Sequence, residues 1–163
     1  MRETPTHIYF WNGFMSNWFI LDKKIKYDRY LFDTSEQMFM FYKAIHFQDK
    51  AMAIEIATKG QDPKVVKAMG RRIKNFDNAD WEYIRETYMV LALEHKFKAD
   101  PKLLKDLLNT GNKILVEGSP FDTIWGVGLH YNDDLILDEK NWKGSNLLGE
   151  SLMKVRKSLS LWT

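Results

Sequence analysis

A carboxylate and an amine, Glu36 and Lys43, lie seven residues apart in a segment that is otherwise rich in Phe, Met and Tyr. Thr34 followed three residues later by Gln37 is a capping-box pattern, which predicts that a helix begins at Ser35. Seven residues return an α-helix to nearly the same face, so the two charged side chains are predicted to share one face. Desolvation penalises both charges, which favours a pair that is either salt-bridged or used in chemistry. The alternative interpretation is an ion pair at the edge of a core helix, with the amine reaching water.

Three cations in four residues, Arg71, Arg72 and Lys74, follow a glycine at the predicted end of another helix. The planar fork of donors on arginine suits a phosphate, so this run is a candidate phosphate clamp. A solvated charge run near a helix C-terminus is the alternative interpretation. Ser16 and Asn17 form a second polar group between aromatic residues, where they belong either to a substrate site or to a turn that satisfies local backbone groups.

A third polar group follows a predicted strand, with Glu117 at the strand end and Asp122 a few residues later. Asp122 is followed by a Trp-Gly-x-Gly sequence that contains Trp125 and Gly126. Loops often carry catalytic residues, and glycines allow a ligand to approach the backbone closely. Each of the three polar groups is a weak signal alone, and their combination favours a functional site.

Aromatic and β-branched runs in the first third of the chain predict short strands, and helices with clear punctuation follow. The predicted strands are His7–Phe10, Trp18–Leu21, Tyr27–Phe32 and Lys113–Glu117, and the predicted helices cover residues 35–44, 48–59, 63–69, 78–97, 101–109 and 147–161. Residues 122–141 are predicted to be rich in loops. We therefore expect one compact α+β domain over residues 1–163, mostly helical, with a small β-sheet formed largely by the N-terminal third.

Composition narrows the class of protein. With 163 residues the chain is long enough for a sizeable core, and its 45% hydrophobic and 28% charged residues are ordinary for a soluble globular protein. Cysteine is absent, and the four histidines lack metal-ligand spacing, so we expect no metal and no cofactor. No run approaches membrane-spanning length, which favours a cytoplasmic protein. The net charge of +2 predicts weak, salt-dependent contact with nucleic acid.

The order of these motifs resembles the NADAR domain (YbiA-like) family of N-glycoside hydrolases, from about Tyr9 to Arg156. The segments that carry the resemblance are Phe14–Asn17, Thr34–Gln37 with Lys43, Met69–Arg71, Lys74–Asp77, Trp81, Ala92–Leu93, Lys96–Phe97, Leu115–Glu117, Asp122, Trp125–Gly128, Gly144–Gly149, Leu152–Met153 and Arg156. Such an ordered set is far more specific than any single motif.

The resemblance implies a hydrolase of N-glycosidic bonds to ribose, with its functional Glu, Lys, Trp and Asp at Glu36, Lys43, Trp81 and Asp122. Family members act on one of two kinds of substrate. Some cleave phosphoribosylated pyrimidine intermediates of riboflavin synthesis, and others remove ADP-ribose from guanine bases in nucleic acid, including in toxin–antitoxin systems.

Breaking such a bond builds positive charge at C1′, which a carboxylate such as Glu36 or Asp122 stabilises. A desolvated Lys43 could also intercept the opened sugar as a Schiff base. We expect Glu36, Lys43 and Asp122 to be catalytic. The expected substrate-binding residues are Ser16, Asn17, Arg71, Lys74, Trp81, Glu117, Trp125, Gly126 and Asn146.

Two cations and Lys74 suit a pyrophosphate and a polymer backbone, so we expect ADP-ribosylated guanine in DNA rather than a ribosylamino-pyrimidine phosphate as the substrate. The segment from Leu129 to Lys143 counts against this choice, because it is longer than in shorter bacterial members and carries Asp133, Asp134, Asp138 and Glu139. Two alternatives stay open: a non-catalytic module that binds ADP-ribose or NAD, and a purely structural interaction protein.

Overall fold

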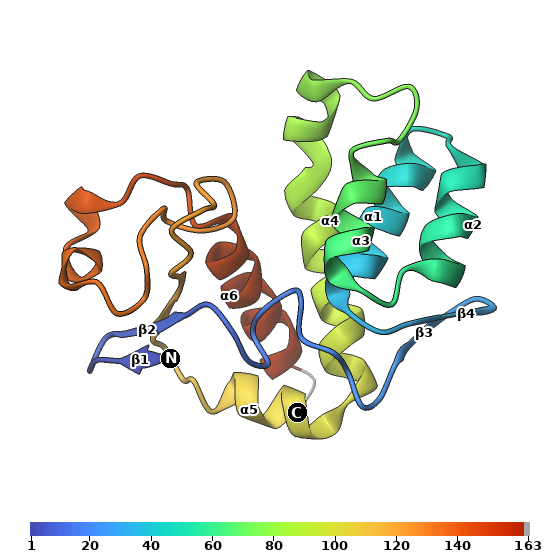
Figure 1. Ribbon diagram of the computed structural model, residues 1–163. Coiled ribbons are helices and arrows are strands. Elements are labelled where there is room, and N and C mark those ends of the chain that lie inside the picture. The colour runs from blue at the N-terminus through green and yellow to red at the C-terminus, as the bar shows by residue number, and fades with distance from the viewer. Residues whose placement is uncertain (162–163) are drawn as a thin grey trace. The chain divides into compact units, whose positions relative to one another are not determined.

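The structure is a computed structural model that describes residues 1–161, and within them the chain has an α+β fold (Figure 1). Two compact units are present: a central unit, Asn17–Pro101, and a terminal unit that combines Met1–Ser16 with the chain from Lys102 on. The helices are α1 (Ser35–His46), α2 (Lys50–Lys59), α3 (Pro63–Gly70), α4 (Asn78–Ala99), α5 (Pro101–Leu108) and α6 (Leu147–Ser160). The strands are β1 (Arg2–Glu3), β2 (His7–Phe10), β3 (Ile25–Tyr27), β4 (Tyr30–Phe32) and β5 (Ile114–Glu117).

In the central unit, α1 packs against α2, α3 and α4 (Figure 1). Every residue of α1 from Ser35 to Tyr42 is buried. Side-chain caps start the four helices of this unit, because Thr34, Asp49, Asp62 and Asp77 each accept a hydrogen bond from a backbone N–H in the first turn. The central unit is therefore organised around a helix whose buried face includes Glu36.

Gln37 fixes the beginning of α1 to its neighbours. Its Oε1 accepts a hydrogen bond from the backbone N–H of Asp33 at 2.8 Å, one residue before the position that a standard capping box would use. Its Nε2 donates to the carbonyl oxygen of Ile56 in α2 at 2.9 Å. Gln37, which the sequence identified as part of the cap of α1, thus also links α1 to α2.

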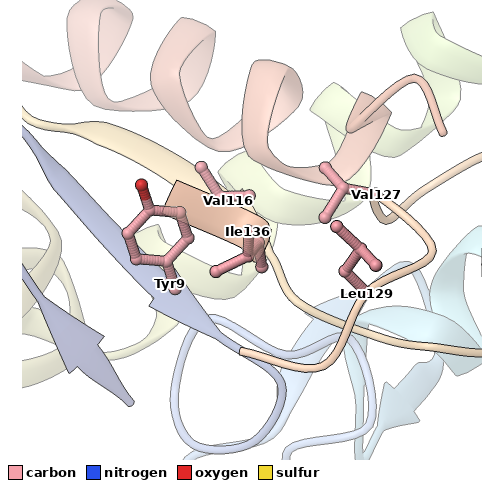
Figure 2. Close-up of a cluster of buried hydrophobic side chains, with 5 residues drawn as sticks. All are labelled: Tyr9, Val116, Val127, Leu129 and Ile136. Carbon is pink, nitrogen blue, oxygen red and sulfur yellow. The ribbon is translucent and has the colours of Figure 1, made fainter. Parts of the chain in front are cut away.

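The terminal unit contains a three-stranded sheet in the order β1-β2-β5, and α6 packs against β5. β1 is antiparallel to β2, whereas β2 and β5 are parallel, with His7 opposite Ile114 and Phe10 opposite Glu117. Figure 2 shows a cluster of buried side chains that joins this sheet to the segment after it: Tyr9, Val116, Val127, Leu129 and Ile136. This core anchors the loop that follows β5.

Two strand predictions differ from the structure. Trp18–Leu21 forms turns and irregular backbone, and Trp18 and Ile20 are 40% and 55% exposed, so their β-propensity finds no partner strand. Tyr27–Phe32 is a tight hairpin of β3 and β4 instead of one strand, because Asp28 adopts a left-handed φ of 52° between them. Within the described residues, no helix is long and apolar enough to cross a membrane.

Candidate active site

Lys43 lies in the central unit at the meeting point of α1, the end of α3 and the start of α4. Its Nζ donates a hydrogen bond to the carbonyl oxygen of Gly70 at 3.0 Å. The same atom lies 4.5 Å from the ring centroid of Phe76 and 5.4 Å from that of Trp81. A carbonyl oxygen and two aromatic faces therefore surround an amine that is half-buried.

Burial lowers the pKa of Lys43 from its ordinary value, because desolvation disfavours the charged form. The negative charge of Glu36 raises the pKa of Lys43, and the positive charge of Arg71 lowers it further. More of the neutral, nucleophilic amine is present at neutral pH than for an exposed lysine. Glu36 and Lys43, which were predicted to share one face of the helix, are thus electrostatically coupled.

Close contact between α1 and α3 brings the carbonyl of Gly70 to Lys43. A Cβ atom at Gly70 would lie 2.2 Å from Sδ of Met40, so glycine allows the last residue of α3 to lie directly against α1. Arg71 follows as the exposed C-cap residue of α3. The end of α3 therefore supplies both an acceptor for the amine and a neighbouring cation.

Asn17 positions the helix turn that carries Glu36. The backbone N–H of Glu36 donates to the carbonyl oxygen of Asn17 at 3.1 Å, and Oγ of Ser35 donates to Oδ1 of Asn17 at 2.9 Å. Nδ2 of Asn17 donates to Sδ of Met89 in α4 at 3.1 Å. Asn17 is buried, and these bonds show how it connects the start of α1 to α4; its predicted contact with substrate stays a prediction.

Trp81 forms one wall beside Lys43. Its ring packs against Phe39 with a centroid distance of 5.3 Å and against Phe47 at 6.1 Å, and it stacks with Tyr88 at an interplanar angle of 18°. Trp81 is only 8% exposed, so most of its surface is used in packing. Its predicted role in substrate binding stays a prediction.

The other cations of the predicted phosphate clamp are exposed. The backbone N–H of Lys74 donates to Oδ2 of Asp49 at 2.9 Å. This bond, together with one from the N–H of Met52, holds the pKa of Asp49 below its ordinary range. The side chains of Arg72 and Lys74 lie at the surface, and Arg71 is the member of this run whose charge lowers the pKa of Lys43.

In the terminal unit, the structure brings together Glu117, Gly126 and Asn146. Asn146, with a left-handed φ of 53°, donates from Nδ2 to the carbonyl oxygen of Leu115 and accepts from the N–H of Glu117, both at 2.9 Å. A Cβ atom at Gly126 would lie 2.9 Å from the carbonyl oxygen of Glu117 and 3.2 Å from its Oε2. Glycine therefore lets the loop pass directly over the end of β5.

Asp122 shapes the loop that contains Trp125. Its Oδ1 accepts hydrogen bonds from the backbone N–H groups of Ile124 at 2.9 Å and Trp125 at 2.7 Å. This is a typical turn-stabilising arrangement for aspartate. The predicted catalytic role of Asp122 is not tested by this geometry. Ser16, also in the terminal unit, is half-buried, and its backbone N–H donates to the carbonyl oxygen of Gly13.

The acidic residues between Asp133 and Glu139 have structural partners. Asp133 and Asp138 cap two short 3₁₀ helices, Asp134–Leu137 and Glu139–Asn141. Asp134 forms an ion pair with Arg2 at 2.9 Å, and Glu139 contacts His7 at 3.3 Å. These contacts belong to the folding of the terminal unit.

Sequence reasoning did not assign roles to Phe76 or to the carbonyl of Gly70, although both contact Lys43. The signal for Phe76 was its place in the Lys74–Asp77 segment that carries the family resemblance, which assigns this residue no role of its own. Within residues 1–161, no group of His, Asp and Glu side chains is arranged to hold a metal ion.

Comparison with known proteins gives a consistent family assignment. Residues 7–160 match the model of the NADAR domain. The chain is 39% identical to N-glycosidase R617 of Acanthamoeba polyphaga mimivirus over 76% of this chain and 72% of that protein. It is 37% identical to protein irg-1 of Caenorhabditis elegans over 89% of this chain and 68% of that protein.

A solved structure agrees with these sequence matches. The NMR structure of the E. coli protein YbiA has a TM-score of 0.78 and 31% identity to this chain, and the match covers 99% of this chain and 89% of the other. The E. coli protein is itself named N-glycosidase YbiA. The similarity to such proteins supports an N-glycosidase activity, and the chain belongs to the NADAR domain family.

Proposed function

We propose that this protein hydrolyses the N-glycosidic bond between ADP-ribose and a guanine base of nucleic acid. The environment of Lys43 is the observation that carries the proposal. A half-buried amine with a lowered pKa, two aromatic faces and a coupled carboxylate is more than ribose binding alone requires. Similarity to proteins named N-glycosidases supports the reaction class.

The first step in this proposal opens the sugar. The carboxylic acid of Glu36 donates its proton to the ribose ring oxygen, and the bond between C1′ and that oxygen breaks. The lone pair of the guanine amine forms a C1′=N iminium. About 10 Å of helix rise separates the Cα atoms of Glu36 and Lys43, a span that two long side chains can close from either side of one sugar.

Lys43 then displaces the guanine base from C1′. Its neutral amine adds to C1′ and loses a proton to the carboxylate of Glu36, which returns that proton to the guanine nitrogen as the C1′–N bond breaks. Water adds to the resulting lysine iminium and gives one proton to Glu36. Collapse of this adduct returns the amine of Lys43 and releases the open-chain aldehyde, which closes to ADP-ribose. The net reaction consumes one water molecule.

A direct route without a covalent intermediate is the competing mechanism. Water attacks C1′ while a carboxylate, either Glu36 or Asp122, stabilises the positive charge that develops there. We propose Asp122 as the alternative carboxylate, acting through its charge while its Oδ1 holds the turn. Detection of a covalent adduct on Lys43 distinguishes the two routes.

Charge supports the choice of substrate. The side chains of three cations that follow α3 are exposed: Arg71, Arg72 and Lys74. Several cations suit a substrate with several phosphates, which the pyrophosphate of ADP-ribose and a nucleic-acid backbone together provide. The acids that counted against nucleic acid cap two short helices or pair with Arg2 and His7. Because each of these acids has a structural role in the terminal unit, their presence alone does not argue for the pyrimidine substrate.

Turnover of two substrates side by side tests the proposal. The protein is incubated in EDTA with an oligonucleotide that carries ADP-ribosylated guanine, and separately with a ribosylamino-pyrimidine phosphate, and products are measured by mass spectrometry. We expect a higher kcat/KM on the oligonucleotide. A clear excess for the pyrimidine would replace the proposed substrate, and tight binding of ADP-ribose without turnover of either would indicate a binding module.

A further inference from the structure

Arg85 occupies the middle of a side-chain row on α4. Trp81, Arg85 and Met89 are spaced by four residues, which places them on one face of the helix. The two neighbours of Arg85 in this row have known contacts with the predicted site. Trp81 lies beside Lys43, and Met89 accepts the hydrogen bond from Asn17.

One end of this row is linked to Glu36 of α1, and the other end lies beside Lys43 of α1. Asn17, which bonds to Met89, also binds the N–H of Glu36, whereas Trp81 packs beside Lys43. α1 and α4 pack together. On α4, Arg85 therefore lies between the residue that packs beside the amine and the residue that is linked to the helix turn of Glu36.

The guanidinium of Arg85 differs from those of the other half-buried arginines. Arg2 is paired with Asp134 at 2.9 Å, and Arg156 donates to Oγ1 of Thr110 at 2.7 Å. By contrast, the buried Nε of Arg85 has no hydrogen-bond partner among residues 1–161. Burying a charged donor without a partner is costly, and such an atom needs an explanation.

We propose that Arg85 binds an oxyanion of the ligand, namely the pyrophosphate of ADP-ribose, through the edge formed by its Nε and one terminal nitrogen. This edge matches two oxygens of a phosphate, and the hydrogen bonds are charge-assisted. The inference deepens the proposed function and rests on it for the identity of the ligand. It adds a half-buried cation on α4 to the exposed cations after Gly70.

Binding of ADP-ribose measured by calorimetry tests the oxyanion site without requiring turnover. Arg85→Gln removes the charge and fork, Arg85→Lys keeps only the charge, and Arg29→Gln is the matched control because Arg29 is exposed in the β3–β4 hairpin. We expect Arg85→Gln to weaken binding about 10- to 100-fold, the range for charge-assisted hydrogen bonds. Arg85→Lys should recover part of this loss, and the control should bind like the unaltered protein.

Kinetics on a trimmed substrate then identify the group that Arg85 contacts. The comparison uses ADP-ribosylated guanosine and the same ribosyl-guanine adduct after enzymatic removal of AMP and phosphate. We expect Arg85→Gln to lower kcat/KM on the first and to leave the second unchanged. Equal losses on both substrates, or equal ADP-ribose affinities of all variants, would overturn the inference.

Failure of the proposed hydrolysis can be distinguished from failure of the Arg85 assignment. If the unaltered protein turns over neither substrate, the proposed hydrolysis fails, and the calorimetric series alone decides the role of Arg85. If it does not bind ADP-ribose, the assignment of the pyrophosphate to Arg85 is contradicted. Thermal denaturation of each variant checks that the fold is retained.

Discussion

The two groups of predicted site residues use their polar atoms in opposite ways. Around Lys43 in the central unit, burial and nearby charges change the pKa of an amine that has one carbonyl acceptor and two aromatic neighbours. In the terminal unit, the side chains of Asp122 and Asn146 are committed to backbone groups that shape a loop. The polar groups around Lys43 thus change the reactivity of an amine, whereas those of Asp122 and Asn146 hold a loop in place.

Substitutions of the reactive pair should have the largest effects. Lys43→Met should lower kcat on ADP-ribosylated guanine by more than about 10⁴-fold, and Glu36→Gln by about 10²–10⁴-fold, because they remove the nucleophile and the proton donor. Single-turnover assays measure both losses. Thermal stability should not fall for Lys43→Met, since burying the amine is costly. Lys50→Met, on the exposed start of α2, is the control. Near-normal turnover by Lys43→Met would favour the direct route.

Asp122 offers a way to separate charge from loop geometry. Asp122→Asn keeps an oxygen for the N–H groups of Ile124 and Trp125, so it should retain the thermal midpoint while lowering kcat about 10²-fold through loss of charge. Asp122→Ala should also lower stability, because two backbone donors lose their acceptor. If Asp122→Asn is fully active, Asp122 is a structural residue only.

Glycine substitutions compare the packing of the two regions. Gly126→Ala should cost about 1–3 kcal/mol of unfolding free energy, because its Cβ would meet the backbone oxygens of Glu117 and Asp122 at 2.9 and 3.0 Å. Gly70→Ala should cost less, since its Cβ meets the flexible side chain of Met40. Denaturant titration measures both. A larger loss for Gly70→Ala would show that the end of α3 is the less adaptable contact.

The smallest expected effect is a shift in pH dependence. The amine of Lys43 must be neutral to react, so the rate at which an added amine-selective reagent modifies Lys43 should rise with pH up to the lowered pKa of Lys43. Arg71 lowers that pKa, and Arg71→Gln should therefore move the rising limb to higher pH. Arg29→Gln should leave the limb in place. A shift to lower pH in Arg71→Gln would contradict the electrostatic account of Lys43.

Local patterns predicted the helices because their signals lie within a few residues. Thr34 and Gln37 set the start of α1, and Asp62 with Pro63 set the start of α3. Trp18–Leu21 was wrongly predicted as a strand because β-propensity does not reveal whether a partner strand exists. Hydrogen bonds between distant residues, such as Lys43 with Gly70 and Asn146 with Leu115, depend on helix and loop packing that no local pattern encodes.

Reductive trapping tests the central claim most directly. The protein is mixed with an oligonucleotide carrying ADP-ribosylated guanine in the presence of cyanoborohydride, and the peptides are analysed by mass spectrometry. We predict that a reduced adduct of the ribose forms on Lys43, and that Lys43→Met forms none. Complete hydrolysis of the substrate with no adduct on Lys43 would contradict the proposed lysine intermediate.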